Sequence, residues 1–510
     1  MFFSLFLFVF VRKKRNKSGV ISIQIITKLK GKSKLVKTIG STKDTNEVDR
    51  FVKEGKRFID GYLGQQILDF SSTGNVLRSA FQRITTHTEV GTDLLLGRIF
   101  NDVGFNLIEG DLFKHLVIAR LYHPVSKLKT SDYLFQNKNI SIPVEKIYRY
   151  LDKLYSEQKE LIQQISYDHT LKILNGLISV VFYDVTTLYF QIDNEDEIRK
   201  RGFSKEEKHQ NPQIVLGLLV SIDGYPLAFD IFEGNKFEGH TMLPILDSFK
   251  EKYKIDKLVI VADSGLLSTQ NIKDLQQKGY EFILGARIKN EPKKLKDKIL
   301  TLKLKNGKSK IIKREDGLNL VISYSDKRAK KDKHNRDRGL QRLEKQIKSG
   351  KLTKSNINNR GYNKYLKMDG DIKISIDKTK YEADSKWDGL KGYVTNTSLN
   401  KGEIIENYGH LWKIEKAFRI SKHDLKVRPI YHRLHNRIEA HITINFAAYK
   451  VYKELERQLK EKQSGLSPEK AIDIAKTIYQ IEANSNSDSI KHILLLTDKQ
   501  KLLAELFDFG

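Results

Sequence analysis

The chain has 510 residues, no cysteine, and a formal net charge of +28 from 91 Lys and Arg against 63 Asp and Glu. The absence of cysteine excludes disulfides and thiolate metal sites, so carboxylates, histidines or water must bind any metal. The length allows roughly two to four domains. The positive charge favours a polyanionic partner, most simply nucleic acid. A generally lysine-rich protein without such a partner is the open alternative.

The N-terminal apolar stretch has the pattern of neither a membrane span nor a signal peptide. Residues 1–11, "MFFSLFLFVFV", are too few to cross a bilayer. A secretory signal carries its positive charge before the apolar run, whereas "RKKRNK" follows it here. We therefore interpret residues 1–10 as a spurious extension and expect no membrane association. Residues 19–40 predict two strands around a Lys/Gly turn, and a helical pattern follows, which makes residues 1–75 a hairpin-and-helix region.

Helical periodicity dominates residues 76–175, as in "DLFKHLVIARLYH". Short helices with Lys and Arg between them could form a helix-turn-helix-like DNA-binding domain, and a plain helical bundle is equally compatible. From residue 177 the period becomes that of strands. The runs "ISVVFYD", "TLYFQI" and "PQIVLGLLVSIDGYPLAFDIFEGN" come first, and helices then alternate with strands. This order predicts a mixed α/β sheet over residues 176–288.

A basic insertion interrupts the predicted sheet. Residues 289–367 contain 26 Lys and Arg against 8 Asp and Glu, a net charge of +18. The sheet pattern resumes near residue 390, so we place the insertion domain at residues 289–395. Residues 396–455 then form the second part of the core, with helices at 402–420 and from 432 onward. We expect a helical region over residues 456–510.

Three acidic residues stand in unusual surroundings. Asp184 interrupts an apolar strand run, and Asp263 follows the buried run "KLVIVA". Glu415 shares a largely apolar helix face with Tyr408 and Phe418. Simple alternatives are that Asp184 bonds to nearby backbone groups and that Glu415 pairs with Arg419 one turn later.

Carboxylates brought together repel one another unless a cation neutralises them. Oxygen ligands suit magnesium or manganese. Two such ions roughly 4 Å apart can activate a water or a 3′-hydroxyl and stabilise the leaving oxygen in phosphoryl transfer. An acid cluster and a basic insertion in one chain therefore suggest a nuclease-like site that acts on DNA.

The order Asp184, Asp263, a long insertion and Glu415 resembles the DDE class of insertion-sequence transposases. One branch of that class shows Tyr, two residues, Arg, three residues, Glu, six residues, Lys. Tyr408, Glu415 and Lys422 match these spacings, but Leu411 stands at the Arg position. The stretches "DVTTLYF", "VADSGL" and "RLHNRIEAHITINFAAY" also look like this branch, so the resemblance covers roughly residues 177–450.

The resemblance implies a ribonuclease-H-like core in which Asp184, Asp263 and Glu415 hold two Mg²⁺ or Mn²⁺ ions. It implies contacts to DNA phosphates by Tyr408 and Lys422. We expect Arg419 to replace the missing guanidinium, because it lies about 40° from Glu415 around a helix.

The resemblance also implies an activity and its partners. The expected partners are double-stranded DNA, as terminal inverted repeats and as target, and a second copy of the chain in a synaptic homodimer. The expected activity is cut-and-paste transposition by metal-dependent cleavage and strand transfer, in the bacterial cytoplasm at the nucleoid. The alternatives are a ribonuclease-H-like nuclease without joining activity and a catalytically silent DNA-binding derivative.

Overall fold

The chain forms two compact units in a computed structural model. One unit comprises Met1–Thr86 with Ile481–Lys491, and the other comprises His87–Gln480 with His492–Gly510. Within the described part of the chain no helix has the length and apolar composition needed to cross a bilayer. The described residues are 8–29, 32–62, 81–203, 208–266, 268–369, 373–484 and 489–509.

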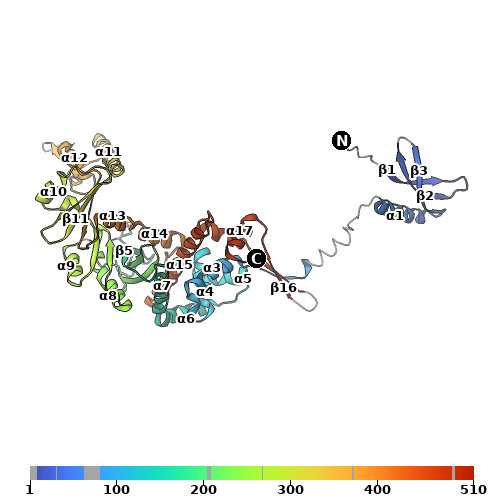
Figure 1. The fold of residues 1–510 in the computed structure, drawn as a ribbon, viewed down its shortest axis with the longest axis horizontal. Coiled ribbons are helices and arrows are strands. Elements are labelled where there is room, and N and C mark those ends of the chain that lie inside the picture. Colours follow the sequence, from blue (N-terminus) through green and yellow to red (C-terminus); the bar gives the residue numbers. More distant parts are fainter. Residues whose placement is uncertain are drawn as a thin grey trace. The chain divides into compact units, whose positions relative to one another are not determined.

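The smaller unit contains an antiparallel sheet in the order β1-β2-β3, and helix α1 packs against it (Figure 1). Ile23 and Ile25 of β2 are fully buried, and α1 contacts all three strands. Residues 8–10, part of the segment that we interpreted as an extension, pair with β2; residues 1–7 and the turn at 30–31 lie outside the described residues. The bounds are β1 (Phe8–Arg15), β2 (Ile21–Leu29), β3 (Lys32–Thr42) and α1 (Thr45–Tyr62).

A mixed sheet of eight strands in the order β10-β11-β14-β9-β8-β5-β6-β7 forms the centre of the larger unit. Strands β5, β6 and β7 are antiparallel neighbours, β8 and β9 run parallel to β5, and the remaining pairs are antiparallel. The predicted mixed α/β class is confirmed. The bounds are β5 (Val180–Tyr189), β6 (Gln213–Ser221), β7 (Pro226–Glu233), β8 (Val259–Ala262), β9 (Glu281–Ala286), β10 (Ser309–Lys313), β11 (Asn319–Tyr324) and β14 (Leu390–Thr395).

One prediction about the sheet was wrong. "ISVVFYD" and "TLYFQI" are not two strands, because β5 runs through both without a break. Asp184 does not end the strand, since its backbone stays in register opposite Leu218 of β6.

Helices cover both faces of this sheet, and Figure 1 shows α8 and α9 on the opposite side of β5 from α13 and α14. Side chains alternate between the faces along a strand. Tyr183 therefore packs in the core that contains α8 and α9, and Phe182 packs in the core that contains α13, α14 and α15. The bounds are α8 (Met242–Tyr253), α9 (Thr269–Gln277), α13 (Lys401–Gly409), α14 (Trp412–Arg419) and α15 (His435–Glu461).

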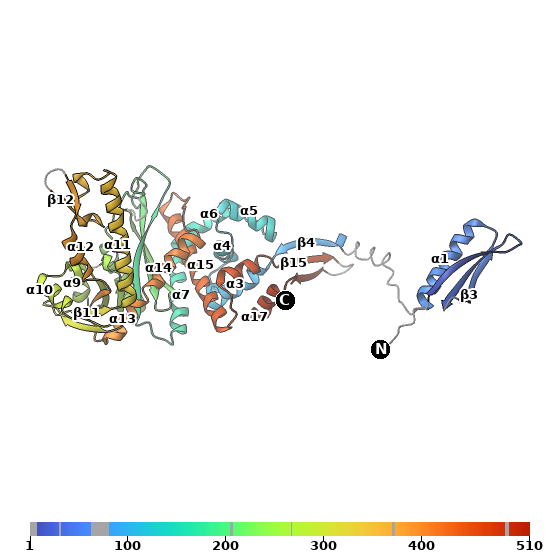
Figure 2. The same ribbon diagram turned by 90° about the horizontal axis from the view of Figure 1, so that it is seen from above.

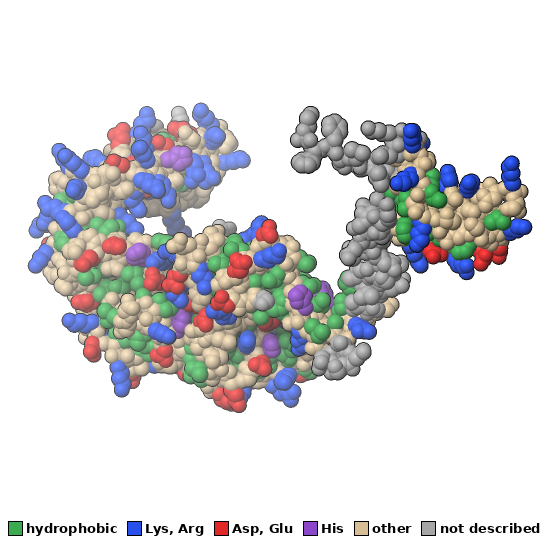
Figure 3. Space-filling view, turned by 45° about the vertical axis from the view of Figure 1, so that its right-hand side comes forward, with side chains coloured by type: hydrophobic (Ala, Val, Ile, Leu, Met, Phe, Trp, Pro, Cys, Tyr) green, Lys and Arg blue, Asp and Glu red, His purple; other side chains and the backbone are tan. Residues whose placement is uncertain are grey.

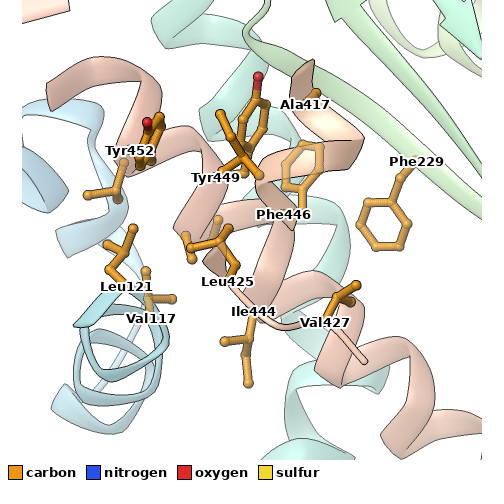
Figure 4. Packing of buried hydrophobic residues seen from close by; sticks show 14 of the residues in the cluster. Val117, Leu121, Phe229, Ala417, Leu425, Val427, Ile444, Phe446, Tyr449 and Tyr452 are labelled. Atoms are coloured by element: carbon orange, nitrogen blue, oxygen red, sulfur yellow. The ribbon is translucent and has the colours of Figure 1, made fainter. Parts of the chain in front are cut away.

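The second of these cores also includes the helices that precede the sheet. Helix α15 is buried on nearly all sides, and its Ile444 and Phe446 share a core with Val117 and Leu121 of α4 (Figure 4). The helices between residues 91 and 173 thus pack directly against the part of the chain that covers the sheet. Its helices are α3 (Gly91–Val103), α4 (Asp111–Tyr122), α5 (Lys127–Lys138), α6 (Val144–Lys153) and α7 (Lys159–Ile173).

The basic insertion adds strands to the main sheet as well as a small cluster of its own. Strands β10 and β11 extend the sheet through β14. Helices α11 and α12 lie side by side (Figure 2), and Leu343, Tyr365 and Leu366 form a small core beside them. Lys and Arg side chains are numerous on this lobe, which is the faint one at the upper left of Figure 3. The bounds are α10 (Lys293–Leu300), α11 (Asp326–Lys348), β12 (Leu366–Asp369), β13 (Lys373–Ile376) and α12 (Lys378–Ser385).

The prediction of a purely helical region over residues 456–510 was wrong. Between α16 and α17 the chain forms β15 and β16, which join β4 in a sheet of order β16-β15-β4. The segment "YQIEAN" alternates apolar and polar residues, which is the period of a strand. The bounds are β4 (Ile84–Glu89), α16 (Pro468–Ala475), β15 (Tyr479–Asn484), β16 (Ser489–Leu494) and α17 (Asp498–Phe507).

Candidate active site

The parallel pairing of β5 with β8 brings Asp184 and Asp263 together. Tyr183 lies opposite Ala262, so the two acids occupy the next position of each chain. Neighbouring strands are about 4.8 Å apart. Asp184 is half-buried and Asp263 is exposed at the end of β8. The simple alternative for Asp184 is also partly correct, because its Oδ1 accepts a hydrogen bond from the Val185 N–H at 2.8 Å.

Both acids lie on the face of the sheet that α13, α14 and α15 cover. Phe182 and Val261 precede them by two positions, so they share the same face, and both pack in the core of those helices. Helix α14 packs on β5 and β6, and α13 packs on β8 and β9. The helix that carries the sequence-predicted Glu415 therefore lies on the same side of the sheet as both aspartates.

Glu415 occupies the first turn of α14 and is exposed. Lys391 of β14 interacts electrostatically with both Glu415 and Asp263. Burial lowers the pKa of Lys391, and Arg328 lowers it further, while Asp263 and Glu415 both act to raise it. The lysine ammonium therefore lies in the field of both carboxylates.

Tyr408 fixes one oxygen of Asp263. Its hydroxyl donates a hydrogen bond to Asp263 Oδ1 at 3.0 Å. Burial raises the pKa of Tyr408, and the Asp263 charge raises it further, so the phenol stays protonated and keeps donating. Gly285 of β9 makes room for it, because an ideal Cβ there would lie 2.4 Å from the Tyr408 hydroxyl oxygen. Lys391 Nζ lies 4.3 Å from the centre of the same ring.

The predicted single helix over residues 402–420 was wrong. Helix α13 ends at Gly409, α14 begins at Trp412, and a π-helix follows over Ile420–Asp424. The turn between the helices is closed by hydrogen bonds from the Leu411 N–H to the Tyr408 carbonyl and from the Lys413 N–H to the His410 carbonyl. The single helix face that we assigned to Tyr408 and Glu415 is therefore not valid.

The remaining predicted site residues take different positions. Leu411, at the place of the family Arg, is buried in the core. Arg419 shares α14 with Glu415 and is exposed; in the described structure the two form no ion pair. Lys422 lies half-buried in the π-helix. The structure thus brings Asp184 and Asp263 together on the sheet and Tyr408 of α13 against Asp263, with Glu415, Arg419 and Lys422 on the segment that follows α13.

Sequence reasoning missed two charged residues of the site, Lys391 and Glu238. Lys391 is an ordinary lysine in a strand pattern, and only the pairing of β14 with β9 brings it to Asp263. Glu238 Oε2 lies 3.9 Å from the position of an ideal Cβ on Gly265, just after Asp263, and its charge also acts on Tyr183 beside Asp184. Glu238 lies in the loop after β7, and a search of this loop for a third acid near β5 and β8 could have found it.

A cleft of about 740 Å³ opens from Asp263 toward the insertion. Its walls include Arg328 and Asn335 of α11, Trp387, and Lys391. Several of its charges are already paired, because Asp384 binds Lys364 at 2.7 Å and also pairs with Lys289. The cleft therefore joins the acidic sheet edge to the basic insertion.

The chemistry of the donor set fits a hard divalent cation, since carboxylate oxygens are the ligands that Mg²⁺ and Mn²⁺ prefer. Among the described residues no group of three or more His, Asp or Glu side chains is close enough to hold an ion. Asp184 and Asp263 are adjacent in register, and Glu415 is coupled to Asp263 through Lys391. The site therefore has the ligand types for a metal, with Glu415 on a separate element.

Residues 175–450, more than half of the chain, match the family model described as "Transposase DDE domain". The chain belongs to this transposase family. The family transfers phosphoryl groups of DNA and uses divalent metal. No curated protein matches the chain. Among solved structures, a piggyBac transposase synaptic complex with hairpin DNA is 10% identical, with a TM-score of 0.36 over 82% of this chain and 78% of that chain.

The contact between Gly285 and Tyr408 gives a stability prediction. Gly285→Ala should lower the free energy of unfolding by about 1–3 kcal/mol, because the new methyl group overlaps the tyrosine hydroxyl. Gly409→Ala is the control, since no atom lies within 4 Å of its ideal Cβ. Urea denaturation followed by the fluorescence of Trp387 and Trp412, both in the larger unit, measures the effect.

A double-mutant cycle tests the cause. Tyr408→Phe removes the hydroxyl and should recover more than about 0.5 kcal/mol of the stability that Gly285→Ala removes. Strictly additive effects of the two changes would contradict the overlap.

Proposed function

We propose that this chain is a cut-and-paste transposase that binds the terminal inverted repeats of an insertion sequence, cleaves there, and joins the ends to target DNA. The observation that carries the proposal is the pair Asp184 and Asp263, adjacent in register on the face that the Glu415 helix covers. Membership of the DDE transposase family supplies the general chemistry. The proposal includes a ribonuclease-H-like core, which three antiparallel strands followed by two parallel strands support.

Asp184, Asp263 and Glu415 are the residues that would hold two Mg²⁺ or Mn²⁺ ions. When bound, such ions activate the attacking water or 3′-hydroxyl and stabilise the leaving oxygen. Tyr408 orients Asp263 by its hydrogen bond, because one lone pair of Oδ1 is then fixed in direction. Lys391 supplies positive charge beside Asp263 and Glu415.

The basic insertion is proposed to follow DNA phosphates toward the acids. The insertion contributes Arg328 of α11 and Lys289 to the wall of the cleft, and the same cleft reaches Asp263. The exposed face of α11 adds lysines that form no ion pair within the described part of the chain: Lys327, Lys330, Lys331 and Lys333. A polyanion passing over α11 would therefore meet unpaired positive charge.

We propose that DNA phosphates are contacted by Tyr408, Arg419 and Lys422. The observations that support this contact differ between the residues. The Tyr408 hydroxyl already donates to Asp263, so its contribution to a phosphate is secondary to positioning that acid. Arg419 is exposed one turn beyond Glu415, where its planar fork can grip a phosphate. The proposal further includes a homodimeric synaptic complex and action at the nucleoid in the bacterial cytoplasm.

The metal site is tested by isosteric amides. Asp263→Asn and Glu415→Gln should each lower Mg²⁺-dependent cleavage of end DNA by roughly 1000-fold or more, because several kcal/mol of transition-state stabilisation are removed. DNA binding should persist. Asp256→Asn, at an exposed position before β8, is the matched control. Normal nicking by Asp263→Asn would contradict the proposal. Cleavage without joining of pre-cleaved ends by the unchanged protein would indicate a nuclease instead.

The role of α11 is tested by charge removal. Replacing Lys327, Lys330, Lys331 and Lys333 by Gln should flatten the log–log salt dependence of DNA binding by roughly 0.9 for each phosphate that these lysines no longer neutralise. A control with the same charge change replaces exposed lysines at the C-terminal end of the chain: Lys462, Lys470, Lys499 and Lys501. Equal slopes for the two variants would mean that α11 only aids solubility.

The proposed phosphate contact of Arg419 is tested against a purely structural role of this side chain on α14. Arg419→Ala should weaken binding of the cleaved end by about tenfold and slow strand transfer, because it removes a charge-assisted hydrogen bond to phosphate. The melting temperature should not change, since Arg419 is exposed. Arg149→Ala, at an exposed position of α6, is the control. Normal joining together with a lowered melting temperature would reject the phosphate contact and leave Lys422 as the candidate.

A further inference from the structure

A second pocket, of about 530 Å³, lies where the N-terminus of α5 meets α4, α15 and the loop before α15. It shares no lining residue with the acidic cleft. Its lining contains no Asp or Glu and includes the basic or imidazole side chains Arg120, Lys127, Lys129, Lys426, His432 and His441. We call this the basic pocket.

Two of its cations are buried without compensation. Arg120 and Lys127 are only 5% and 4% exposed, and within the described residues the side chain of neither forms a hydrogen bond or an ion pair. The Arg120 Nε is a buried donor that has no acceptor there. The other lysines that are buried among the described residues are compensated, since Lys138 binds Glu89 at 2.9 Å and Lys450 donates to the Ser166 carbonyl at 2.9 Å. A buried charge without a partner is strongly unfavourable, so an anion placed between the two side chains would stabilise both in their charged forms.

Neighbouring groups do not supply that anion. Burial lowers the pKa of Lys127, and Arg120 lowers it further, which reflects their mutual repulsion. His441 donates from Nε2 to the Val427 carbonyl at 2.9 Å, and its Nδ1 is buried with no partner among the described residues. The Asp152 charge acts on His432 at the pocket, but Arg437 holds Asp152 with two hydrogen bonds. The pocket therefore gathers basic and imidazole side chains, with no carboxylate among its described lining residues.

Helix α5 adds a further preference for negative charge. Its 12 residues begin at Lys127, and Ser126 caps it by accepting from the Lys129 N–H at 3.3 Å. The free N–H groups and the dipole of a helix N-terminus favour an anion. Lys129 and Lys426 are exposed at the pocket, and Tyr431 is 70% exposed beside them, so a ligand attached to a larger polymer has access.

We propose that the basic pocket binds a phosphate group between Arg120 and Lys127 at the N-terminus of α5. A phosphate offers several acceptor oxygens, which suits a guanidinium fork and an ammonium together. Two sources share this chemistry: a phosphodiester of the DNA backbone and free inorganic phosphate. The DNA source rests on the proposed function.

The experiment uses the full chain and compares the unchanged protein with Lys127→Met and with the control Lys146→Met, at an exposed position of α6 outside the pocket. The first measurement is the melting temperature in inorganic phosphate and in sodium chloride of equal ionic strength. Phosphate should raise it for the unchanged protein and for Lys146→Met, and not for Lys127→Met. Without phosphate, Lys127→Met should melt at the same or a higher temperature, because it removes an unpaired buried charge.

The second measurement is DNA affinity as a function of salt. Lys127→Met should weaken binding by about tenfold and reduce the slope by roughly 0.9 if the phosphate belongs to DNA. Lys127→Arg keeps the positive charge, so it should retain both the DNA affinity and the slope of its salt dependence. A loss of both in Lys127→Arg as well would indicate a folding defect. Phosphate stabilisation with an unchanged DNA slope assigns the pocket to free phosphate.

No stabilisation of the unchanged protein by phosphate, together with an unchanged slope, overturns the proposal. A melting temperature of Lys127→Met below that of the unchanged protein in chloride also overturns it. Cleavage of end DNA is assayed in parallel. Cleavage without phosphate binding rejects this pocket alone, and phosphate binding without cleavage rejects the proposed function alone.

Discussion

The parallel pairing of β5 with β8 is the constraint on which the candidate site depends. It fixes Asp184 and Asp263 at equivalent positions of neighbouring strands, where two carboxylates repel each other. The surrounding residues reduce that cost in different ways. The Tyr408 hydroxyl binds one oxygen of Asp263, and the Lys391 ammonium lies in the field of Asp263 and Glu415. A site arranged in this way is suited to receive further positive charge.

The positions of the acids were predictable because strand patterns are local. Asp184 interrupts an apolar strand run, and Asp263 follows a buried run, so both could be assigned to strand positions from the residues alone. The sequence could also place Glu415 on a helix. What it could not give is the break between α13 and α14, because "GEIIENYGHLWKIEKAFR" keeps a helical period across the turn at residues 410–411. The docking of Tyr408 against Gly285 is a tertiary contact that local periodicity does not report.

Charged residues whose importance depends on burial could also not be identified from the sequence. Lys391 and Lys127 look like any other lysine among the 91 basic residues of the chain. Their significance comes from strand and helix packing, which removes Lys127 from water without giving it a carboxylate among the described residues. The contrast with Lys138, which is also buried but bound to Glu89, can be seen only once all these helices are in place.

The acidic site and the basic pocket are held by one continuous core. The chain runs from Glu415 through the π-helix to Lys426 and on to His441, and it contributes Ile414, Leu425 and Val427 to the core that contains Ile444 and Val117 (Figure 4). Close-packed interiors have low compressibility and resist deformation. A phosphate held in the basic pocket would therefore have a fixed relation to the carboxylates, because the same buried side chains set both positions. That relation would give the chain a physical means of aligning DNA with its acids that does not depend on contacts at the scissile bond.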